Sequence, residues 1–537
     1  MPFLTKRLLL RIGFILVSGL VLYIISSSIN ETTHHDNTQS RSSDSSSSKS
    51  TNDQRVNKWS IPSIPNGMKG IFRGNQAYNK KLNEYERDEY DSGGGKDGWV
   101  DLDKELLVTR YEGGVPGYQV FSNLYLVNSV LTSVIPSSSS STTTDDQLIA
   151  VQDKFTSGRD NDNNDDDDER EQISTQKAFP NVKHILSSEK RGIQADEDRW
   201  KLVDQNVGRE EIGKKGYKLG GVTYIFNDPP GPDGYLIYFR HFVLEAFLGA
   251  TRILASTLAV DQDLSIPKRI WFPRCGSEPS WRDDRGENAW FLAHALPSAT
   301  VEDKNGWDDR NTAGLPILLE KVVIVDRWAA HSSGGEVGKW GKMNALIPST
   351  SATKSFWQPI RSNVIRSLGV DGSSEIGSTG LPVVVYVDRQ KESPKMKQSD
   401  HDAMVEGLMS LTNIAEVHVA RISAMSKARQ VEITSKAQVI VSLHGDELFT
   451  ALWMPSIENS LVIELFEEGG FIRDFELLAT SLNHRYIAVS GNKVLTEEEW
   501  RETGATKGVE RDKGEISINT ELVIRLIEES LESNTRA

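Results

Sequence analysis

Residues 437–466 read AQVIVSLHGDELFTALWMPSIENSLVIELF, with two apolar runs on either side of a short polar segment. Residues 439–443 and 461–466 are short and rich in β-branched and other apolar side chains, which predicts two strands that are buried on both faces. The polar segment and a loop around Pro455 separate them. This order of elements is typical of a parallel sheet in an α/β fold.

The polar segment after the first run is a candidate site for an anion. His444 and Gly445 end the strand, and glycine lets the backbone turn sharply and approach a ligand closely. The next residues can begin a helix, whose free N–H groups would face a phosphate. The second run carries one acid, Glu464, and acids near the carboxyl end of a parallel strand often face a ligand crevice. The alternative is a buried turn in which His444 bonds to the backbone.

Composition limits the classes of function. A chain of 537 residues is long enough for two sizeable domains. The net charge of −15 argues against nucleic-acid binding, although one acidic run holds much of this charge. Cys275 is the only cysteine, which excludes intrachain disulfides and zinc sites built on several thiolates.

The pattern of apolar residues predicts two lobes. Residues 381–537 alternate strands and helices, which implies a parallel sheet with helices on both faces. A Gly/Ser-rich hinge at 370–380 separates this lobe from a first lobe at 96–369. The predicted strands are 99–107, 117–135, 221–226, 234–239, 268–273, 321–326, 383–387 and 417–420, and the predicted helices are 241–258, 402–411, 425–435 and 521–533.

The N-terminal residues predict a membrane anchor. Residues 1–11 include three basic side chains and precede an apolar segment of about 18 residues, 12–29, which is long enough to span a bilayer. No cleavage site of the A-x-A kind follows, which favours an uncleaved anchor over a signal peptide. Because the positive charges precede the span, residues 1–11 are expected in the cytosol and the rest in the lumen, a type II arrangement.

Two polar regions are expected to lie outside the folded lobes. Residues 30–95 are rich in Ser, Asn and charge and predict a flexible stem, which begins with a glycosylation sequon at Asn30. Residues 137–176 form an insertion rich in Ser, Thr and Asp. It lacks the fixed ligand offsets of a calcium loop, so we interpret it as a solvated, disordered loop.

His241 and Glu245 are the candidate catalytic pair. They are four residues apart in a predicted amphipathic helix, hence on one face and one turn apart. A histidine placed in this way can act as a base that the carboxylate orients. The alternative is an ordinary surface hydrogen bond. Gly249, further along the helix, would permit close packing.

Other candidate ligand residues stand in charged loops and at strand ends. The segment 281–288, WRDDRGEN, offers Trp281 for stacking on a sugar or base and Arg285 for clamping an anion. Arg327 follows a predicted strand and could line the rim of a ligand site. Arg389 ends a predicted strand of the second lobe, where it could neutralise a diphosphate. The alternatives are a solvated loop for 281–288, a structural salt bridge for Arg327 and an ordinary surface position for Arg389.

Motifs of several other enzyme classes are missing. The sequence has no P-loop, no Gly-x-Ser-x-Gly elbow and no HExxH. The acidic triplets DLD at 101–103 and DQD at 261–263 do not follow a clearly buried strand. Hydrolase functions therefore lack their residues, and we predict neither a metal site nor a cofactor.

Several segments, taken in order, resemble glycosyltransferase family 61, particularly its fungal members. GYQVFSNLYLVNS is similar to the early strand pair of the family, and HFVLEAFLGATRIL to its pattern of His, an acid four residues on, Leu-Gly and Arg. WRDDRGEN, VVIVDRWAAH and VYVDRQ are similar to its middle motifs. LHGDELFTALWMP followed by VIELF is similar to its His-Gly signature and closing acid. The resemblance covers most of residues 117–489.

This resemblance implies a type II membrane enzyme of the Golgi apparatus or endoplasmic reticulum, with two Rossmann-like lobes in the GT-B arrangement. Such enzymes transfer a sugar with inversion, generally without a bound metal. Family members use UDP-xylose, UDP-arabinose or UDP-N-acetylglucosamine, and a glycan or glycoprotein hydroxyl is the expected acceptor. We therefore expect His241 and Glu245 to be catalytic, Arg389, His444, Gly445, Asp446 and Glu464 to bind the nucleotide-sugar, and Trp281, Arg285 and Arg327 to bind substrate.

The sequence departs from the family after the His-Gly pair. Members commonly have a small residue and a glycine there, whereas Asp446 and Glu447 follow in this chain. Two carboxylates therefore stand where a diphosphate would approach, unless they cap the helix and point away. The alternative function is a membrane-tethered binding protein that keeps the fold and has lost catalysis.

Overall fold

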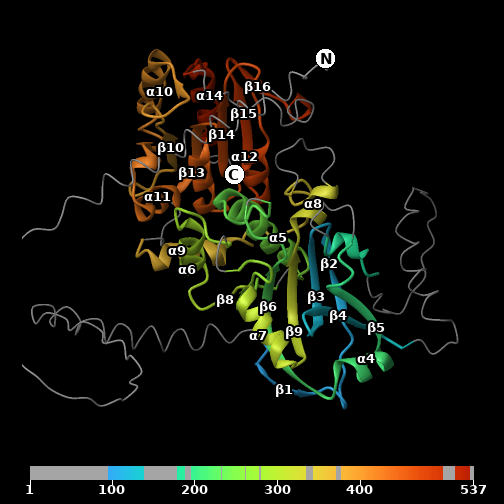
Figure 1. Ribbon diagram of the computed structural model, residues 1–537. Coiled ribbons are helices and arrows are strands. Elements are labelled where there is room, and N and C mark those ends of the chain that lie inside the picture. The colour runs from blue at the N-terminus through green and yellow to red at the C-terminus, as the bar shows by residue number, and fades with distance from the viewer. Residues whose placement is uncertain are drawn as a thin grey trace, which may run out of the picture. The chain divides into compact units, whose positions relative to one another are not determined.

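The computed structural model describes residues 95–137, 178–187, 195–231, 233–259, 262–276, 280–333, 343–370, 377–499 and 514–532 (Figure 1). The predicted tail, anchor, sequon at Asn30, stem and acidic insertion lie outside these residues, apart from one residue each of the stem and the insertion. None of the helices in the described ranges is long and apolar enough to cross a membrane. All described residues belong to one compact unit.

The described residues of the first lobe form a mixed nine-stranded sheet with the main order β5-β4-β3-β9-β6-β7-β8. Strand β6 is parallel to both β9 and β7, whereas β3 is antiparallel to both β4 and β9. The strands are β1 (Gly98–Asp101), β2 (Arg110–Val115), β3 (Tyr118–Val127), β4 (Val130–Ile135), β5 (Trp200–Asp204), β6 (Lys215–Phe226), β7 (Arg269–Trp271), β8 (Thr300–Glu302) and β9 (Ile317–Val325).

Short turns explain the antiparallel strands of this sheet. Asn128 and Ser129 join β3 to β4 with positive φ angles of 50° and 64°, which suits a two-residue hairpin turn. A connection this short returns the chain antiparallel. The prediction of an α/β fold with parallel strands is confirmed, but the first sheet is mixed because its N-terminal strands meet through such turns.

The described residues of the second lobe form a six-stranded sheet in the order β12-β10-β13-β14-β15-β16, parallel except at β16. In chain order the first five strands run 2-1-3-4-5, so the winding reverses between β10 and β13, where ligands of such sheets bind. The strands are β10 (Val383–Val387), β12 (Glu416–Ala420), β13 (Ala437–Leu443), β14 (Leu461–Phe466), β15 (Arg485–Ser490) and β16 (Lys493–Leu495), with β11 (Lys395–Met396) paired separately to β17 (Glu515–Ile516).

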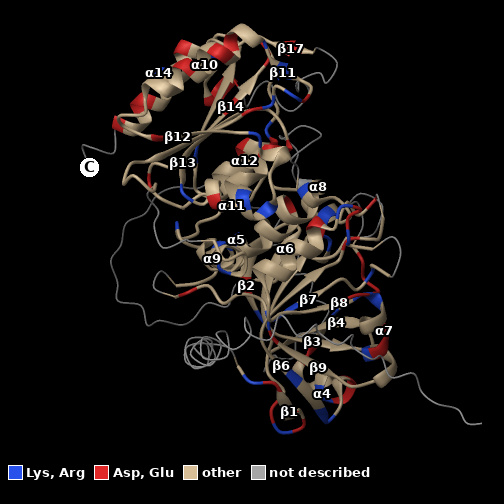
Figure 2. Ribbon diagram, turned by 90° about the vertical axis from the view of Figure 1, so that its left-hand side faces the viewer, with Lys and Arg blue, Asp and Glu red and all other residues tan. Residues whose placement is uncertain are grey.

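Helices cover both faces of the second sheet, as the alternating pattern predicted. α10 (Gln398–Ser410) and α14 (Thr520–Glu532) pack Met404 and Val523 on one face, and Figure 2 shows acidic residues along both helices. The other face packs against α11 (Lys427–Thr434), the 3₁₀ helix η5 (Asp446–Trp453) and α12 (Asp474–Ser481). Because both faces are covered, β10, β13 and β14 are buried along their whole length.

One hydrophobic core runs through both lobes. It joins Tyr118 and Phe226 of the first sheet to Val385 and Ile440 of the second through buried residues of several helices. The predicted hinge at 370–380, of which 371–376 lie outside the described residues, does not divide this core. The remaining helices are η2 (Val182–His184), α4 (Gln205–Ile212), η3 (Arg240–Phe247), α5 (Leu248–Ser256), α6 (Glu287–Ala295), α7 (Lys304–Ala313), α8 (Arg327–Ser333), α9 (Gln358–Ser367) and η4 (Ile422–Ala424).

The helix predicted at 241–258 begins as a π-helix, η3, and continues as α5. Its amphipathic character is not observed, because η3 contacts η5, and α5 contacts both β3 and α12. Nearly all of its side chains are consequently buried. π-helical turns are rare and occur frequently at functional sites.

The prediction of a strand at 234–239 is wrong, since these residues form turns that lead into η3. Tyr235 has a φ of 62°, a left-handed conformation that a strand does not contain. The α-carbon of Gly234 lies against the carbonyl of Pro229, where any side chain would clash. The Pro-Pro pair before it helps to set this turn.

Gly249 does permit close packing, as predicted. A Cβ at this position would lie 2.5 Å from Cε1 of Tyr118, whose hydroxyl donates to the carbonyl of Glu245 at 3.2 Å. We expect Gly249→Ala to lower the free energy of unfolding by about 1–3 kcal/mol in urea denaturation of the full chain, because Tyr118 has no room to move. Gly98→Ala, where no heavy atom lies within 4 Å, is the control. Equal effects of the two changes would contradict this interpretation.

His484 makes the stability depend on pH. The ring is buried, with Nδ1 2.7 Å from the hydroxyl of Ser460 and Nε2 3.3 Å from the carbonyl of Ala451, and burial lowers its pKa to about 4. Between pH 6.5 and 4, His484 binds a proton in the unfolded chain but stays neutral in the folded chain. The free energy of unfolding therefore falls as the pH falls. The neutral ring of His484 lowers the free energy of unfolding at pH 4 by about 3 kcal/mol relative to pH 7.

His484→Gln keeps a donor and an acceptor without titrating. We expect its stability relative to the parent to rise as the pH is lowered from 7 to 4, measured by urea denaturation at each pH. The half-buried His418, on the edge strand β12, is the control position. A constant difference between His484→Gln and the parent across this range would exclude the buried ring as the source.

Candidate functional site

Two parallel strands of the first sheet end side by side and present a cluster of charges. β6 leads into Asp228, and β9 leads into Asp326 and Arg327. Asp326 accepts from the backbone N–H of Ala329 at 2.8 Å and so caps the start of α8. The backbone N–H of Arg327 donates to Oδ1 of Asp228 at 2.6 Å, which ties the two strand ends together.

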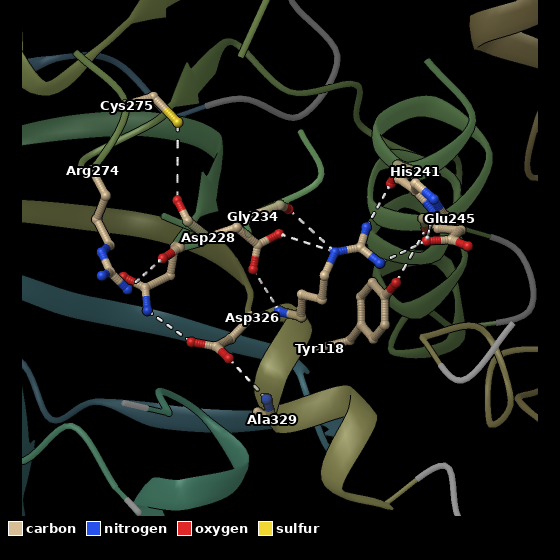
Figure 3. Close-up of polar contacts among 11 residues, drawn as sticks. Tyr118, Asp228, Gly234, His241, Glu245, Arg274, Cys275, Asp326 and Ala329 are labelled. Atoms are coloured by element: carbon tan, nitrogen blue, oxygen red, sulfur yellow. Dashed lines mark hydrogen bonds and ion pairs between the residues drawn. The ribbon is translucent and has the colours of Figure 1, made fainter. Parts of the chain in front are cut away.

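The side chain of Arg327 connects this cluster to the π-helix, whose His241 and Glu245 are labelled in Figure 3. It is 1% exposed and donates to Oε2 of Glu245 at 2.8 Å, to the carbonyl of His241 at 3.0 Å and to the carbonyl of Gly234 at 3.3 Å. Burial lowers the pKa of Arg327, but Glu245 and Asp228 outweigh it and raise the pKa above its usual value. The guanidinium therefore stays charged.

Glu245 holds His241 by its ring. Its Oε2 lies 2.9 Å from Nδ1 of His241, and both side chains are largely buried, so the pair is not a surface hydrogen bond. Burial raises the pKa of Glu245, but His241 and Arg327 together lower it below its usual range. An ionised Glu245 favours a proton on Nδ1 and leaves Nε2 as the basic nitrogen. No bond from Nε2 to another described residue is found, so the ring can accept a proton there.

Asp228 is the buried acid behind this pair. Burial raises its pKa to about 7, and its Oδ2 has no hydrogen-bond partner among the described residues. Arg327 acts against the effect of burial, with its Nε 4.0 Å from Oδ2 of Asp228. The positive charge of Arg327 is therefore shared between Asp228 and Glu245.

Arg240 joins the first lobe to the second. It donates to Asp474 at 2.9 Å and to Asp446 at 2.6 Å, and its guanidinium lies 5.3 Å from the ring centre of Phe475. A small pocket lies beside it, lined by Arg240, Leu244, Glu245, Asn344, Asp474, Phe475 and Leu477. Glu245 of the candidate catalytic pair and the second lobe therefore meet at one pocket.

The second lobe brings its charged residues to the switch point of its sheet. Arg389 follows β10, and His444 follows the neighbouring strand β13. Nδ1 of His444 lies 2.5 Å from Oε1 of Glu464, whose Oε2 accepts from the hydroxyl of Tyr486 at 2.6 Å. The predicted alternative, a ring bonded to the backbone, is wrong: the backbone N–H of His444 bonds Leu465, while its ring bonds a carboxylate.

Gly445 leaves room for Arg389. A Cβ on Gly445 would collide with the guanidinium of Arg389, so the absence of a side chain at Gly445 is what admits Arg389. Arg389 forms an ion pair with Glu447 and a longer one of 3.6 Å with Glu392. Arg389, His444, Gly445 and Asp446 thus lie around one loop.

No hydrogen bond or ion pair between described residues joins the three predicted substrate residues to this loop. Trp281 is 3% exposed and stacks on Phe272 at 4.9 Å between ring centres, and it also lines a second pocket with Glu302 and Asp303, so its role in stacking on a sugar or base stays a prediction. Arg327 is buried and orients Glu245, so it does not line an open rim. Arg285 is exposed, and no side-chain bond of it to another described residue is found. Of the three, only Arg327 is fully enclosed by protein, because a charged residue at a strand end can pack inward against a buried acid.

Four residues of the site were not predicted: Asp228, Arg240, Asp474 and Tyr486. Arg240 precedes His241 in an aromatic run, and an arginine in such a run was a usable signal. Asp474 resembles an ordinary acid in the first turn of a helix. Nothing local distinguishes Asp228 or Tyr486.

The described residues contain no group of three or more His, Cys, Asp or Glu side chains that could hold a metal ion. No protein-family model matches the sequence. A search of curated proteins gives no match either. Any assignment of function therefore depends on the geometry of the site and on the motifs.

Proposed function

We propose that the protein is an inverting glycosyltransferase that transfers a sugar from a UDP-sugar to a hydroxyl of a glycan or glycoprotein. One observation carries the proposal. His241 is held by Glu245, which lines a pocket shared with the second lobe, and the parallel strands of that lobe have their switch point at Arg389 and His444. A base next to an anion site is the minimum that inverting transfer requires.

The reaction is a single displacement. His241 takes the proton of the acceptor hydroxyl at Nε2, and the hydroxyl oxygen forms a bond to the anomeric carbon while the bond to the diphosphate breaks. The released UDP carries the electron pair of that bond, and the nearby arginines stabilise its charge. Glu245 stabilises the imidazolium that results.

The finer features of the proposal come from the resemblance to glycosyltransferase family 61. They are the GT-B arrangement, a lumenal orientation behind a type II anchor in the Golgi apparatus or endoplasmic reticulum, and a donor among UDP-xylose, UDP-arabinose and UDP-N-acetylglucosamine. The second sheet, with its 2-1-3-4-5 order, supports a nucleotide site in the second lobe.

A screen for UDP release tests the proposal. The purified full chain is incubated separately with each of the three UDP-sugars, with and without glycan acceptors, and free UDP is measured. We expect release from one donor that increases with a suitable acceptor. Binding of UDP without release from any donor would contradict the proposal.

The alternative is a binding protein that has lost catalysis. It is favoured by the ion pairs of Asp446 with Arg240 and of Glu447 with Arg389, which occupy the cations that a diphosphate would need. A melting assay separates the two functions. Saturating UDP raises the melting temperature of an enzyme that binds a UDP-sugar donor, whereas it does not change that of a chain whose site is blocked.

A further inference from the structure

Two arginines flank the loop at Gly445, and each is held by one of two consecutive acids. Arg240 of η3 pairs with Asp446, and Arg389 after β10 pairs with Glu447. Burial lowers the pKa of Arg389, and Glu392 and Asp446 act against it. Asp446 is therefore close enough to influence both guanidinium groups, which come from different lobes.

Arg389 has a donor that the protein leaves unused. Its side chain is 9% exposed, and its Nε has no hydrogen-bond partner among the described residues. A buried N–H of a charged group without an acceptor is rare in folded proteins. The position of this group beside Gly445, at the switch point of the sheet, indicates an anionic ligand that supplies the missing acceptor.

Arg240 has one firm partner and one that is easily lost. Asp474, whose side chain is 12% exposed, orients the guanidinium from the protein side at 2.9 Å. The side chain of Asp446 is 72% exposed, and ion pairs of exposed carboxylates are weak. A ligand can displace Asp446 while Asp474 keeps Arg240 in place.

We propose that Arg240 and Arg389 together bind the diphosphate of a nucleoside diphosphate, and that Asp446 and Glu447 occupy the two arginines until this ligand displaces them. The inference rests on the proposed function, because it identifies how the donor site is filled and regulated. The two acids are consecutive in the chain and each holds one of the two arginines, so together they supply one negative charge to each guanidinium. Two linked phosphates offer the same pattern, and guanidinium groups bind phosphate oxygens in pairs.

The two acids then compete with the ligand, and removing one should strengthen binding. Binding of UDP and of inorganic pyrophosphate to the purified full chain is measured by calorimetry. We expect Asp446→Asn to bind both about tenfold more tightly than the parent, because one repulsive charge is removed and Arg240 is freed. Arg240→Gln should bind both about tenfold more weakly, and adding Asp446→Asn to it should restore little.

The control is Glu211→Gln, which removes the same charge from a surface ion pair between Glu211 of α4 and Lys201 of β5. It should leave both affinities unchanged. Higher salt should weaken binding to the parent and to Asp446→Asn alike. Comparing UDP with pyrophosphate shows how much of the affinity the diphosphate supplies.

The inference is overturned if Asp446→Asn and the double variant Asp446→Asn, Glu447→Gln bind UDP and pyrophosphate no more tightly than the parent. Absence of binding in the parent and in both variants also overturns it. The proposed function fails on a different readout, which is UDP release from the three donors. Tighter binding in Asp446→Asn without any release would support the displaced acids and contradict the transferase.

Discussion

His241→Ala is expected to lower the rate of UDP release in the presence of acceptor by about 100- to 10,000-fold. Nδ1 of His241 is held by Glu245, a buried, ionised carboxylate that lines the shared pocket. Without the ring, the proposed base for the proton of the acceptor hydroxyl is missing. The measurement is the initial rate with the donor identified in the screen.

The matched control is His418→Ala. His418 also pairs with a glutamate, at 2.9 Å, but it lies on β12 at the edge of the second sheet. Its rate should stay within a factor of two of the parent. A rate for His241→Ala within threefold of the parent, in a chain that melts like the parent, would remove His241 from the proposed mechanism.

Arg327→Met is expected to lower the free energy of unfolding by about 3–5 kcal/mol. The change leaves Glu245 buried without the guanidinium that donates to it at 2.8 Å and removes the hydrogen bond to the carbonyl of Gly234. Asp228, with a pKa of about 7 in the parent, loses its nearest cation and stays protonated at neutral pH. Urea denaturation of the full chain at pH 7 measures the loss.

A double-mutant cycle isolates the ion pair. Adding Glu245→Gln to Arg327→Met removes the unpaired charge. We therefore expect the double variant to lose less free energy of unfolding than the two single variants lose in total. Arg209→Met, at an exposed position on α4, should change stability by less than about 0.5 kcal/mol. Strict additivity in the cycle would mean that Arg327 and Glu245 contribute independently.

The sequence predicted the parts of the fold that depend on local patterns. The strand expected at 383–387 is observed with those bounds, and the strand at 461–466 likewise, because buried β-branched runs favour this conformation wherever they occur. The contact between His241 and Glu245 was predicted because helical spacing alone brings them together. It survives the change from an α-helix to a π-helix.

The parts that could not be predicted depend on distant partners. Arg240 and Asp474 are 234 positions apart, and no local pattern pairs them. Trp281 was expected at a binding surface, but whether an aromatic ring faces a ligand or Phe272 is decided by the packing of separate segments. Tyr235 adopts a left-handed backbone that its own residue type does not favour.

The core that runs through both lobes has a consequence for how the chain folds during synthesis. Arg252 of α5 donates to the carbonyl of Ser481 at 2.7 Å and to the side chain of Asn483 at 2.9 Å, and Leu482 belongs to the same core. At the usual speed of translation, roughly 10–45 s separate the synthesis of these two regions. The nascent first lobe must keep an apolar surface exposed for that time, which makes it a natural client for chaperones.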